Sequence, residues 1–132
     1  MAGYSGTPLA KKLGIGPGSR LYTRDAPENY ARLVAERIEF APRLDDKVDI
    51  IHVFATRRAK LAEALRSALS KMRQDAAIWV SWPKKASKVA TDITEDTIRE
   101  IALPMGLVDI KVCAVDETWS GLRLVWRKER RG

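Results

Sequence analysis

The stretch VDIIHVFA, residues 48–55, constrains the fold more than any other part of the sequence. It is almost continuously apolar, which is typical of a strand that is buried on both faces. Such strands occur in parallel sheets whose two faces are covered by helices. A further strand, AAIWVSW, is expected at 76–82, after a segment with helical periodicity. The pattern therefore predicts an α/β sandwich with a mostly parallel sheet and right-handed crossovers.

Helix start signals separate the expected strands. Thr7 followed by Pro8 favours a short helix over 8–13, and Pro27 is expected to open a second one. Thr56 can cap a third helix, in which apolar side chains fall on one face and basic side chains on the other. A fourth helix is expected to begin at Asp92 or Thr94. The other strands are expected at 20–23, 38–40, 108–115 and 121–128.

Two connections carry information about topology. Only five residues, Asp116 to Ser120, join the last two strands, so these strands should pair as an antiparallel hairpin. The link APRLDDK, which precedes the 48–55 strand, is too short for a crossover helix. Either this link runs extended across the sheet, or the 38–40 strand is a marginal edge element. The direction of that strand stays open. The whole chain, residues 1–132, is expected to form a single domain.

Charge and cysteine content limit the partners and the cellular setting. The net charge of +7 favours anionic partners such as nucleotides, phosphates or nucleic acid. One cysteine, Cys113, forms no internal disulfide, and with one histidine, His52, no zinc cluster is expected. No apolar run is long enough to span a bilayer, and the first residues contain no apolar signal region. We therefore expect a cytoplasmic protein of bacterial type, without a membrane contact or a structural metal.

The order of strands and helices resembles a shortened class I methyltransferase fold, a Rossmann-like three-layer sandwich. In that family the last strand returns antiparallel and inserts beside its predecessor. The resemblance implies a six-stranded sheet in the order 2-1-3-4-6-5. The stretches MAGYSGTPLAKKLGI, WVSWPKKASKVATDITED and GLVDIKVCAVDETWSGL also resemble recurring blocks of a family of short bacterial proteins catalogued as a domain of unknown function. That family brings no assigned reaction.

The methyltransferase resemblance also implies where S-adenosylmethionine would bind, namely at a glycine-rich turn after the first strand. The turn here, TRDAPENY at 23–30, contains no glycine, and Gly14, Gly16 and Gly18 all precede the strand. No acidic residue ends the second strand, which closes with FAPRL. We therefore expect no cofactor. No catalytic motif is present either, and His52 and Cys113 are interpreted as core residues.

Candidate ligand-binding residues lie in the loops that follow the strands, because ligands of open α/β sheets bind outside the carboxyl ends of the strands. Lysines and hydroxyl groups suit a phosphate, and the helix that starts near Thr56 adds its dipole. The two tryptophans either stack on a base or pack. Asp116 and Glu117 either serve as a general base or hold their loop by capping it. The candidates are Thr56, Arg57, Ser81, Trp82, Lys84, Lys85, Ser87, Lys88, Asp116 and Trp119.

These features favour a non-catalytic module that binds a phosphate-bearing or other anionic small molecule. One alternative is a divergent S-adenosylmethionine-dependent methyltransferase that holds its cofactor by other contacts. Another is a nucleic-acid-binding protein that uses the basic helix 57–73 and the C-terminal tail, although this helix has no aromatic residues between its basic ones. A further alternative is that Lys84, Lys85 and Lys88 form no site and are only the solvated end of a strand. The oligomeric state and the ligand are not indicated.

Overall fold

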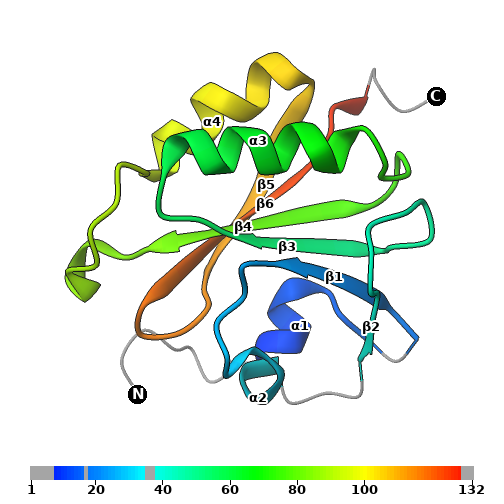
Figure 1. Cartoon of the computed structure of the whole chain (residues 1–132), viewed down its shortest axis with the longest axis horizontal. Helices are drawn as coiled ribbons and strands as arrows, with labels where there is room; N and C mark the ends of the chain where they lie inside the picture. Colours follow the sequence, from blue (N-terminus) through cyan, green and yellow to red (C-terminus); the bar gives the residue numbers. More distant parts are fainter. Residues whose placement is uncertain (1–7, 17, 35–37, 129–132) are drawn as a thin grey trace.

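The computed structural model describes residues 8–16, 18–34 and 38–128. They contain a six-stranded sheet in the order β2-β1-β3-β4-β6-β5 (Figure 1). Strands β1 to β4 run parallel, whereas β6 lies antiparallel between β4 and β5, which confirms the predicted order. The strands are β1 (Arg20–Arg24), β2 (Glu39–Phe40), β3 (Ile50–Phe54), β4 (Ala77–Pro83), β5 (Leu107–Ala114) and β6 (Trp119–Trp126).

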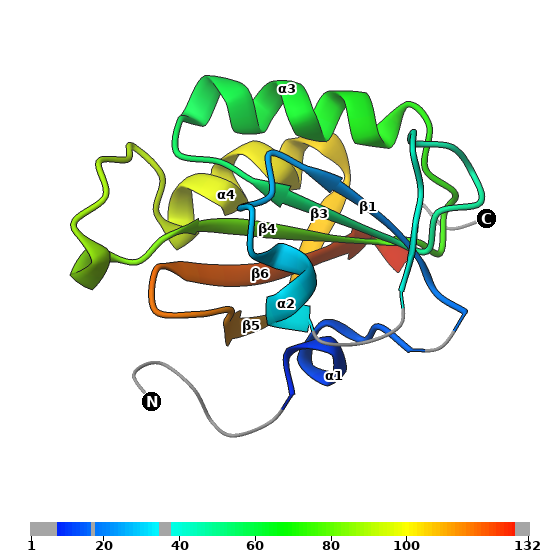
Figure 2. The ribbon, with the colours of Figure 1, turned by 60° about the horizontal axis from the view of Figure 1, so that its bottom comes forward.

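Helices cover both faces of the sheet, so the fold has three layers (Figure 2). Helices α3 (Arg58–Leu69) and α4 (Glu95–Ala102) pack on one face, over a core cluster formed with β3, β4 and β6. Helices α1 (Leu9–Leu13) and α2 (Tyr30–Val34) pack on the other face, around a second cluster that includes Trp79. Within the described ranges no helix is long and apolar enough to cross a membrane.

The central strands β3 and β4 are buried along their full lengths, as the apolar run at 48–55 predicts. Strand β2 is only two residues long, is exposed, and pairs parallel with β1 at the sheet edge. The link from β2 to β3 contains no helix, and its ends donate hydrogen bonds to β1 from Ala41 N and Asp49 N. The 38–40 strand is therefore a marginal edge element. The link also crosses the sheet past β1, because β2 and β3 lie on opposite sides of that strand, so both interpretations fit.

Helix α2 begins later than expected. It starts at Tyr30 rather than at Pro27, because Tyr30 N donates a hydrogen bond to Pro27 O (3.0 Å) within a turn that precedes the helix. Helix α1 occupies the expected place, with Pro8 at its N-cap position. The expected cap at Thr7 lies outside the described residues.

Thr56 does not cap helix α3. The helix begins at Arg58, and its N-cap residue, Arg57, makes no capping hydrogen bond with its side chain. Instead, Asp92 Oδ1 accepts a hydrogen bond from Arg58 N (2.6 Å). The segment that carries Asp92 is fixed there by Thr91 Oγ1, which donates to Thr56 O (2.7 Å). A carboxylate from the chain itself thus stabilises the start of α3.

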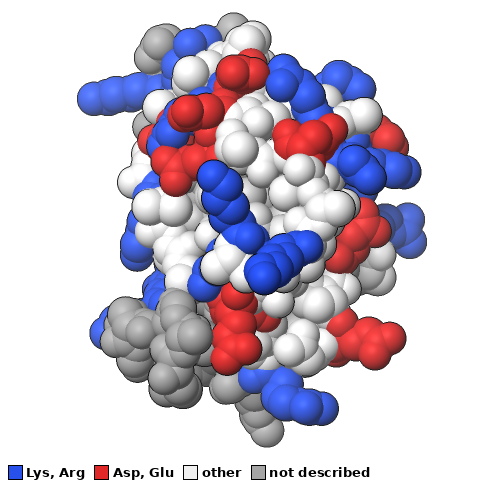
Figure 3. All heavy atoms as spheres, turned by 90° about the vertical axis from the view of Figure 1, so that its left-hand side faces the viewer, with Lys and Arg blue, Asp and Glu red and all other residues white. Residues whose placement is uncertain are grey.

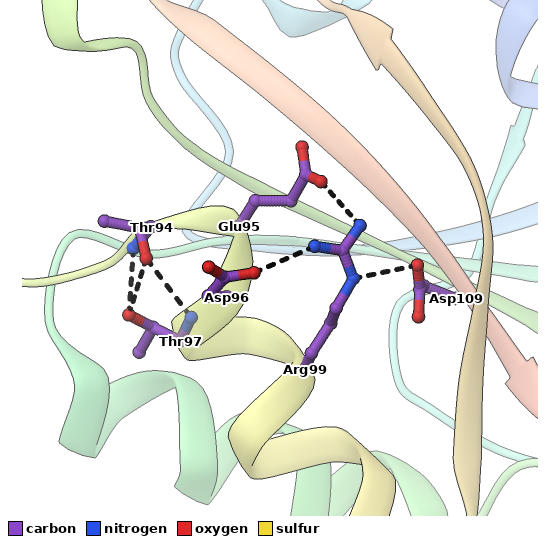
Figure 4. A network of polar contacts seen from close by, with 6 residues as sticks. All are labelled: Thr94, Glu95, Asp96, Thr97, Arg99 and Asp109. Atoms are coloured by element: carbon purple, nitrogen blue, oxygen red, sulfur yellow. Dashed lines mark hydrogen bonds and ion pairs between the residues drawn. The ribbon is translucent and has the colours of Figure 1, made fainter.

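Helix α4 begins as predicted and is tied to the sheet by an arginine. Thr94 is its N-cap, and Thr94 and Thr97 form a reciprocal capping box (Figure 4). Arg99 Nε donates to Asp109 Oδ2 on β5 (3.0 Å), which links the helix to the edge strand. The guanidinium also pairs within the helix with Glu95 (2.5 Å) and Asp96 (3.1 Å).

Candidate functional site

A cavity of about 310 Å³ lies at the carboxyl ends of β1 and β3. It is formed by the turn after β1, the end of β3, the first turn of α3 and the start of β6. This is the place in an open α/β sheet where ligands normally bind. The residues that line it are Asp25, Phe54, Ala55, Thr56, Lys60 and Trp119.

Two of the predicted ligand-binding residues, Thr56 and Trp119, line this cavity. Both are half-buried. The Trp119 ring packs edge-to-face on Phe54, with ring centroids 5.0 Å apart. Trp119 therefore packs against the core and at the same time presents part of its surface to the cavity, so the two alternatives considered for this residue are compatible.

Asp25 occupies the turn in which a methyltransferase fold would carry glycine. Its φ angle is 58°, in the left-handed region that glycine adopts without strain and that aspartate tolerates better than most residues. The turn therefore has a glycine-like backbone at this residue but adds a carboxylate to the cavity wall.

Asp25, Phe54 and Lys60 were not among the predicted ligand-binding residues. The helical pattern places Lys60 on the basic face of the predicted third helix, and in the structure it lies in the first turn of α3. Asp25 and Phe54 could have been found from the sequence by their closeness to the carboxyl end of a strand, because Asp25 directly follows β1 and Phe54 is the last residue of β3.

The three predicted lysines do not line this cavity. They belong to a turn that extends beyond β4, at the far left of Figure 1, where Lys85 and Lys88 are exposed and Lys84 is half-buried. Ser87 Oγ donates to Lys84 O (2.6 Å) and accepts from Val89 N (3.3 Å), so its hydroxyl closes the turn. Lys84 N donates to Thr118 O (2.7 Å), which joins this turn to the β5–β6 connection.

Four further candidates have separate surroundings. Arg57 is exposed at the start of α3. Trp82 is only 8% exposed and packs in the core beneath α3 and α4. Asp116 Oδ1 accepts hydrogen bonds from Thr118 N and Trp119 N (2.8 Å each), so this carboxylate caps the β5–β6 turn. Ser81 is fully buried, away from any surface that a ligand reaches.

Ser81 belongs to a buried chain of hydrogen bonds across the sheet. His52 Nε2 lies 2.7 Å from Ser81 Oγ, and His52 Nδ1 lies 2.8 Å from the Tyr30 hydroxyl. Burial lowers the pKa of His52 from 6.5 to about 3 and raises the pKa of Tyr30, so both side chains are neutral. His52 is therefore a satisfied core histidine, as expected from the sequence.

The face at the carboxyl ends of the strands carries charges of both signs. Figure 3 shows lysine and arginine side chains near the middle of this face, with acidic side chains above and below them. At the start of α3, Arg58 pairs with Glu100 (3.3 Å), and Arg24, the last residue of β1, pairs with Glu63 (3.1 Å). The basic side of this region is therefore partly neutralised, which weakens it as a nucleic-acid surface.

Redox and metal chemistry have few candidate side chains in this structure. Burial raises the pKa of the Cys113 thiol, which disfavours the reactive thiolate. Among the described residues, no group of three or more His, Cys, Asp or Glu side chains is placed to hold a metal ion.

The sheet order and the helices on both faces define the protein as a Rossmann-like α/β protein with the topology of class I methyltransferases. The chain belongs to the family described as Protein of unknown function (DUF3052), whose model matches residues 24–128. No curated protein matches the sequence.

Several solved structures share the fold. A putative type 11 methyltransferase from Sulfolobus solfataricus is 12% identical, with 91% of this chain and 90% of that chain covered and a TM-score of 0.61. The B. subtilis M1A22 tRNA methyltransferase TrmK is 12% identical, with 91% and 65% covered and a TM-score of 0.58. Aeropyrum pernix fibrillarin, in complex with natively bound S-adenosyl-L-methionine, is 20% identical, with 84% and 57% covered and a TM-score of 0.50. At these identities the similarity shows a shared fold alone.

Replacing Ser81 by alanine should destabilise the protein by about 1–3 kcal/mol, because His52 Nε2 would lose its hydrogen-bond partner inside the core. Urea unfolding followed by circular dichroism measures this change. Ser67→Ala, the same substitution at an exposed position of α3, is the control and should shift the free energy of unfolding by less than about 0.5 kcal/mol. Equal stabilities of the two variants would contradict the buried network.

The His52 ring should stay neutral in the folded protein between pH 8 and pH 5. Because it is the only histidine, its NMR ring signals are unambiguous and should not shift over this range. The imidazole has a pKa of 6.5 in the unfolded chain and of about 3 in the folded chain. The contribution of this residue to stability is therefore lost as the pH falls from 6.5 to about 3. A ring titration with a midpoint near 6.5 would contradict the burial of this side chain.

Proposed function

We propose that the protein is a non-catalytic module that binds a phosphate-bearing or other anionic small molecule at the carboxyl ends of its strands. The observation that supports this best is the 310 Å³ cavity, which combines the Lys60 ammonium, the Thr56 hydroxyl and the Trp119 ring. A lysine can neutralise a phosphate group, and an indole ring can cover a flat apolar group.

The chemistry of the cavity wall narrows the ligand class. Asp25 provides a carboxylate that accepts hydrogen bonds from hydroxyl or amino groups. A ligand with a phosphate, a hydrogen-bond donor and a flat ring would therefore match Lys60, Asp25 and Trp119 together. Nucleotides have this combination of groups.

The exposed lysines beyond β4 act at longer range in this proposal. Lys84, Lys85 and Lys88 lie at the same end of the sheet as the cavity but do not line it. Their charge raises the local concentration of an anion and speeds its association, an effect that salt screens. The N-terminus of helix α3 attracts an anionic ligand less strongly than its dipole alone would, because the Asp92 carboxylate already accepts the hydrogen bond of Arg58 N.

The second candidate function is a divergent S-adenosylmethionine-dependent methyltransferase. The position of the cavity and the glycine-like backbone of Asp25 favour it, together with the methyltransferase fold of the similar structures. The absence of glycine from residues 23–30 speaks against it, as does a cavity volume at the lower end of the range for ligand pockets.

A nucleotide should raise the melting temperature by mass action. At about a hundred times its dissociation constant, the ligand adds about 2.7 kcal/mol to the free energy of unfolding. Thermal melts with phosphate, sulfate, AMP, ATP and GTP, compared with chloride at matched ionic strength, measure this shift. Lys60→Gln should abolish it, whereas the triple variant Lys84→Gln, Lys85→Gln, Lys88→Gln should reduce it most at low salt.

The matched control for the melts is Lys47→Gln, which removes one exposed lysine from the link that leads into the start of β3. This variant should respond to the nucleotide as the parent does. The proposal is wrong if no anion raises the melting temperature, or if Lys60→Gln and the triple variant both respond like the parent.

S-adenosylmethionine should not bind with micromolar affinity. The turn at 23–30 places side chains where this cofactor needs a bare backbone, and Pro27 supplies no amide donor. Isothermal titration calorimetry with S-adenosylmethionine and S-adenosylhomocysteine checks the expectation. Micromolar binding of either compound would favour the methyltransferase over the non-catalytic module.

A further inference from the structure

We propose a second ligand site at the opposite, amino-terminal end of the parallel strands, where Arg123 binds the carboxylate or phosphate group of a small molecule. The site is a cavity of about 380 Å³. The turn between α1 and β1, the starts of β3 and β4, and the β6 residue Arg123 form its walls. It shares no lining residue with the cavity at the carboxyl ends, so the two proposals stand or fall separately.

Arg123 is the main reason to expect an anion in this cavity. It lies on β6 opposite Trp79 and is half-buried. Its Nε atom is buried and, among the described residues, has no hydrogen-bond partner. No carboxylate in the described part of the chain pairs with its guanidinium. Buried polar atoms normally have partners, so the guanidinium is incompletely satisfied within the described residues, and its Nη1 atom lies near Gly14 of the cavity wall, where a bound molecule can pair with it.

The other charged groups of the cavity are one arginine and two carboxylates, which form ion pairs with one another. Arg73 pairs with Asp49 and, through Nε, with Asp75 (2.6 Å). Burial acts to raise the pKa of Asp49, but hydrogen bonds from Arg20 N and the Arg73 side chain outweigh it, so the pKa is lowered. Asp49 is therefore an anion held by Arg73, and Arg123 is the described lining cation that pairs with neither carboxylate, although its charge balances the lining.

The guanidinium can bind a carboxylate or a phosphate through two parallel hydrogen bonds. Its stem is held in place, because the Nε atom is buried. A fixed guanidinium loses less conformational entropy on binding than an exposed flexible lysine does. The geometry thus suits a single anionic group.

The glycine-rich turn before β1 leaves room beside this guanidinium. Gly14 has φ 75°, and a Cβ atom there would lie 3.6 Å from Arg123 Nη1. Gly18 has φ 87°, and a Cβ atom there would meet no atom within 4 Å. Ser19 Oγ accepts a hydrogen bond from Gly16 N (3.1 Å), so its own proton can be donated to a ligand. These glycines, which precede the first strand, thereby acquire a role that a cofactor site after β1 does not give them.

NMR titrations of the ¹⁵N-labelled full chain test this site. Sodium acetate and sodium phosphate are added separately while sodium chloride keeps the ionic strength constant. Saturable shifts are expected for the amides of Gly14, Gly18 and Ser19 and for the Arg123 Nε–H. Saturation by acetate alone identifies a carboxylate ligand, and saturation by phosphate alone identifies a phosphate ligand.

Three variants make the result specific to Arg123. Arg123→Gln should weaken binding by about tenfold or more, because charge-assisted hydrogen bonds are lost. Arg123→Lys keeps the charge but loses the bidentate geometry, so binding should be intermediate. Arg66→Gln, which removes an exposed arginine from α3, should bind like the parent.

The proposal is overturned if the parent protein shows no saturable shift at Gly14, Gly18 and Ser19. It is also overturned if Arg123→Lys binds as tightly as the parent, or if a folded Arg123→Gln variant does. Should Arg123→Gln fail to fold, the parent titration and Arg123→Lys decide the matter. Shifts confined to Thr56, Lys60 and Trp119 would support the carboxyl-end cavity and refute the Arg123 site.

Discussion

The pairing of β3 with β4 is the interaction on which the rest of the structure depends. Both strands are buried on both faces, so helices have to cover the sheet on each side. This requirement explains why α3 and α4 pack on one face while the much shorter α1 and α2 cover the other. It also leaves only the two ends of the strands as places where a ligand can approach the centre of the sheet, and the structure has a cavity at each end.

The hairpin and the central strand could be predicted from local features of the chain, whereas the strand order came from the resemblance to class I methyltransferases. The short connection from Asp116 to Ser120 requires a hairpin, and the apolar run at 48–55 requires a central strand. Helix starts were less predictable where tertiary contacts override local signals. The start of α3 is the clearest case, since its capping carboxylate, Asp92, comes from a distant loop that no pattern around Thr56 reveals.

The candidate site could be predicted in position but only partly in composition. Ser81 lies near the end of β4, yet its side chain points toward His52, because the direction of each side chain depends on strand pairing. The lysines follow the same strand, but β4 continues to Pro83, which pairs with Trp119, and this carries the lysines past the cavity. Lys60 was missed because the helical pattern groups it with the other basic residues of the helix, whereas its place in the first turn of α3 brings it to the cavity.

The His52–Ser81 hydrogen bond has a consequence for the alignment of the two central strands. Apolar segments such as IIHVF and AIWVSWP are chemically so uniform that a displacement by two residues would keep every side chain on its original face. The His52 imidazole and the Ser81 hydroxyl would then lose their mutual hydrogen bond, and each buried group left without a partner costs about 1–3 kcal/mol. The His52–Ser81 hydrogen bond between the otherwise apolar strands β3 and β4 thus favours one alignment among several that burial alone would allow.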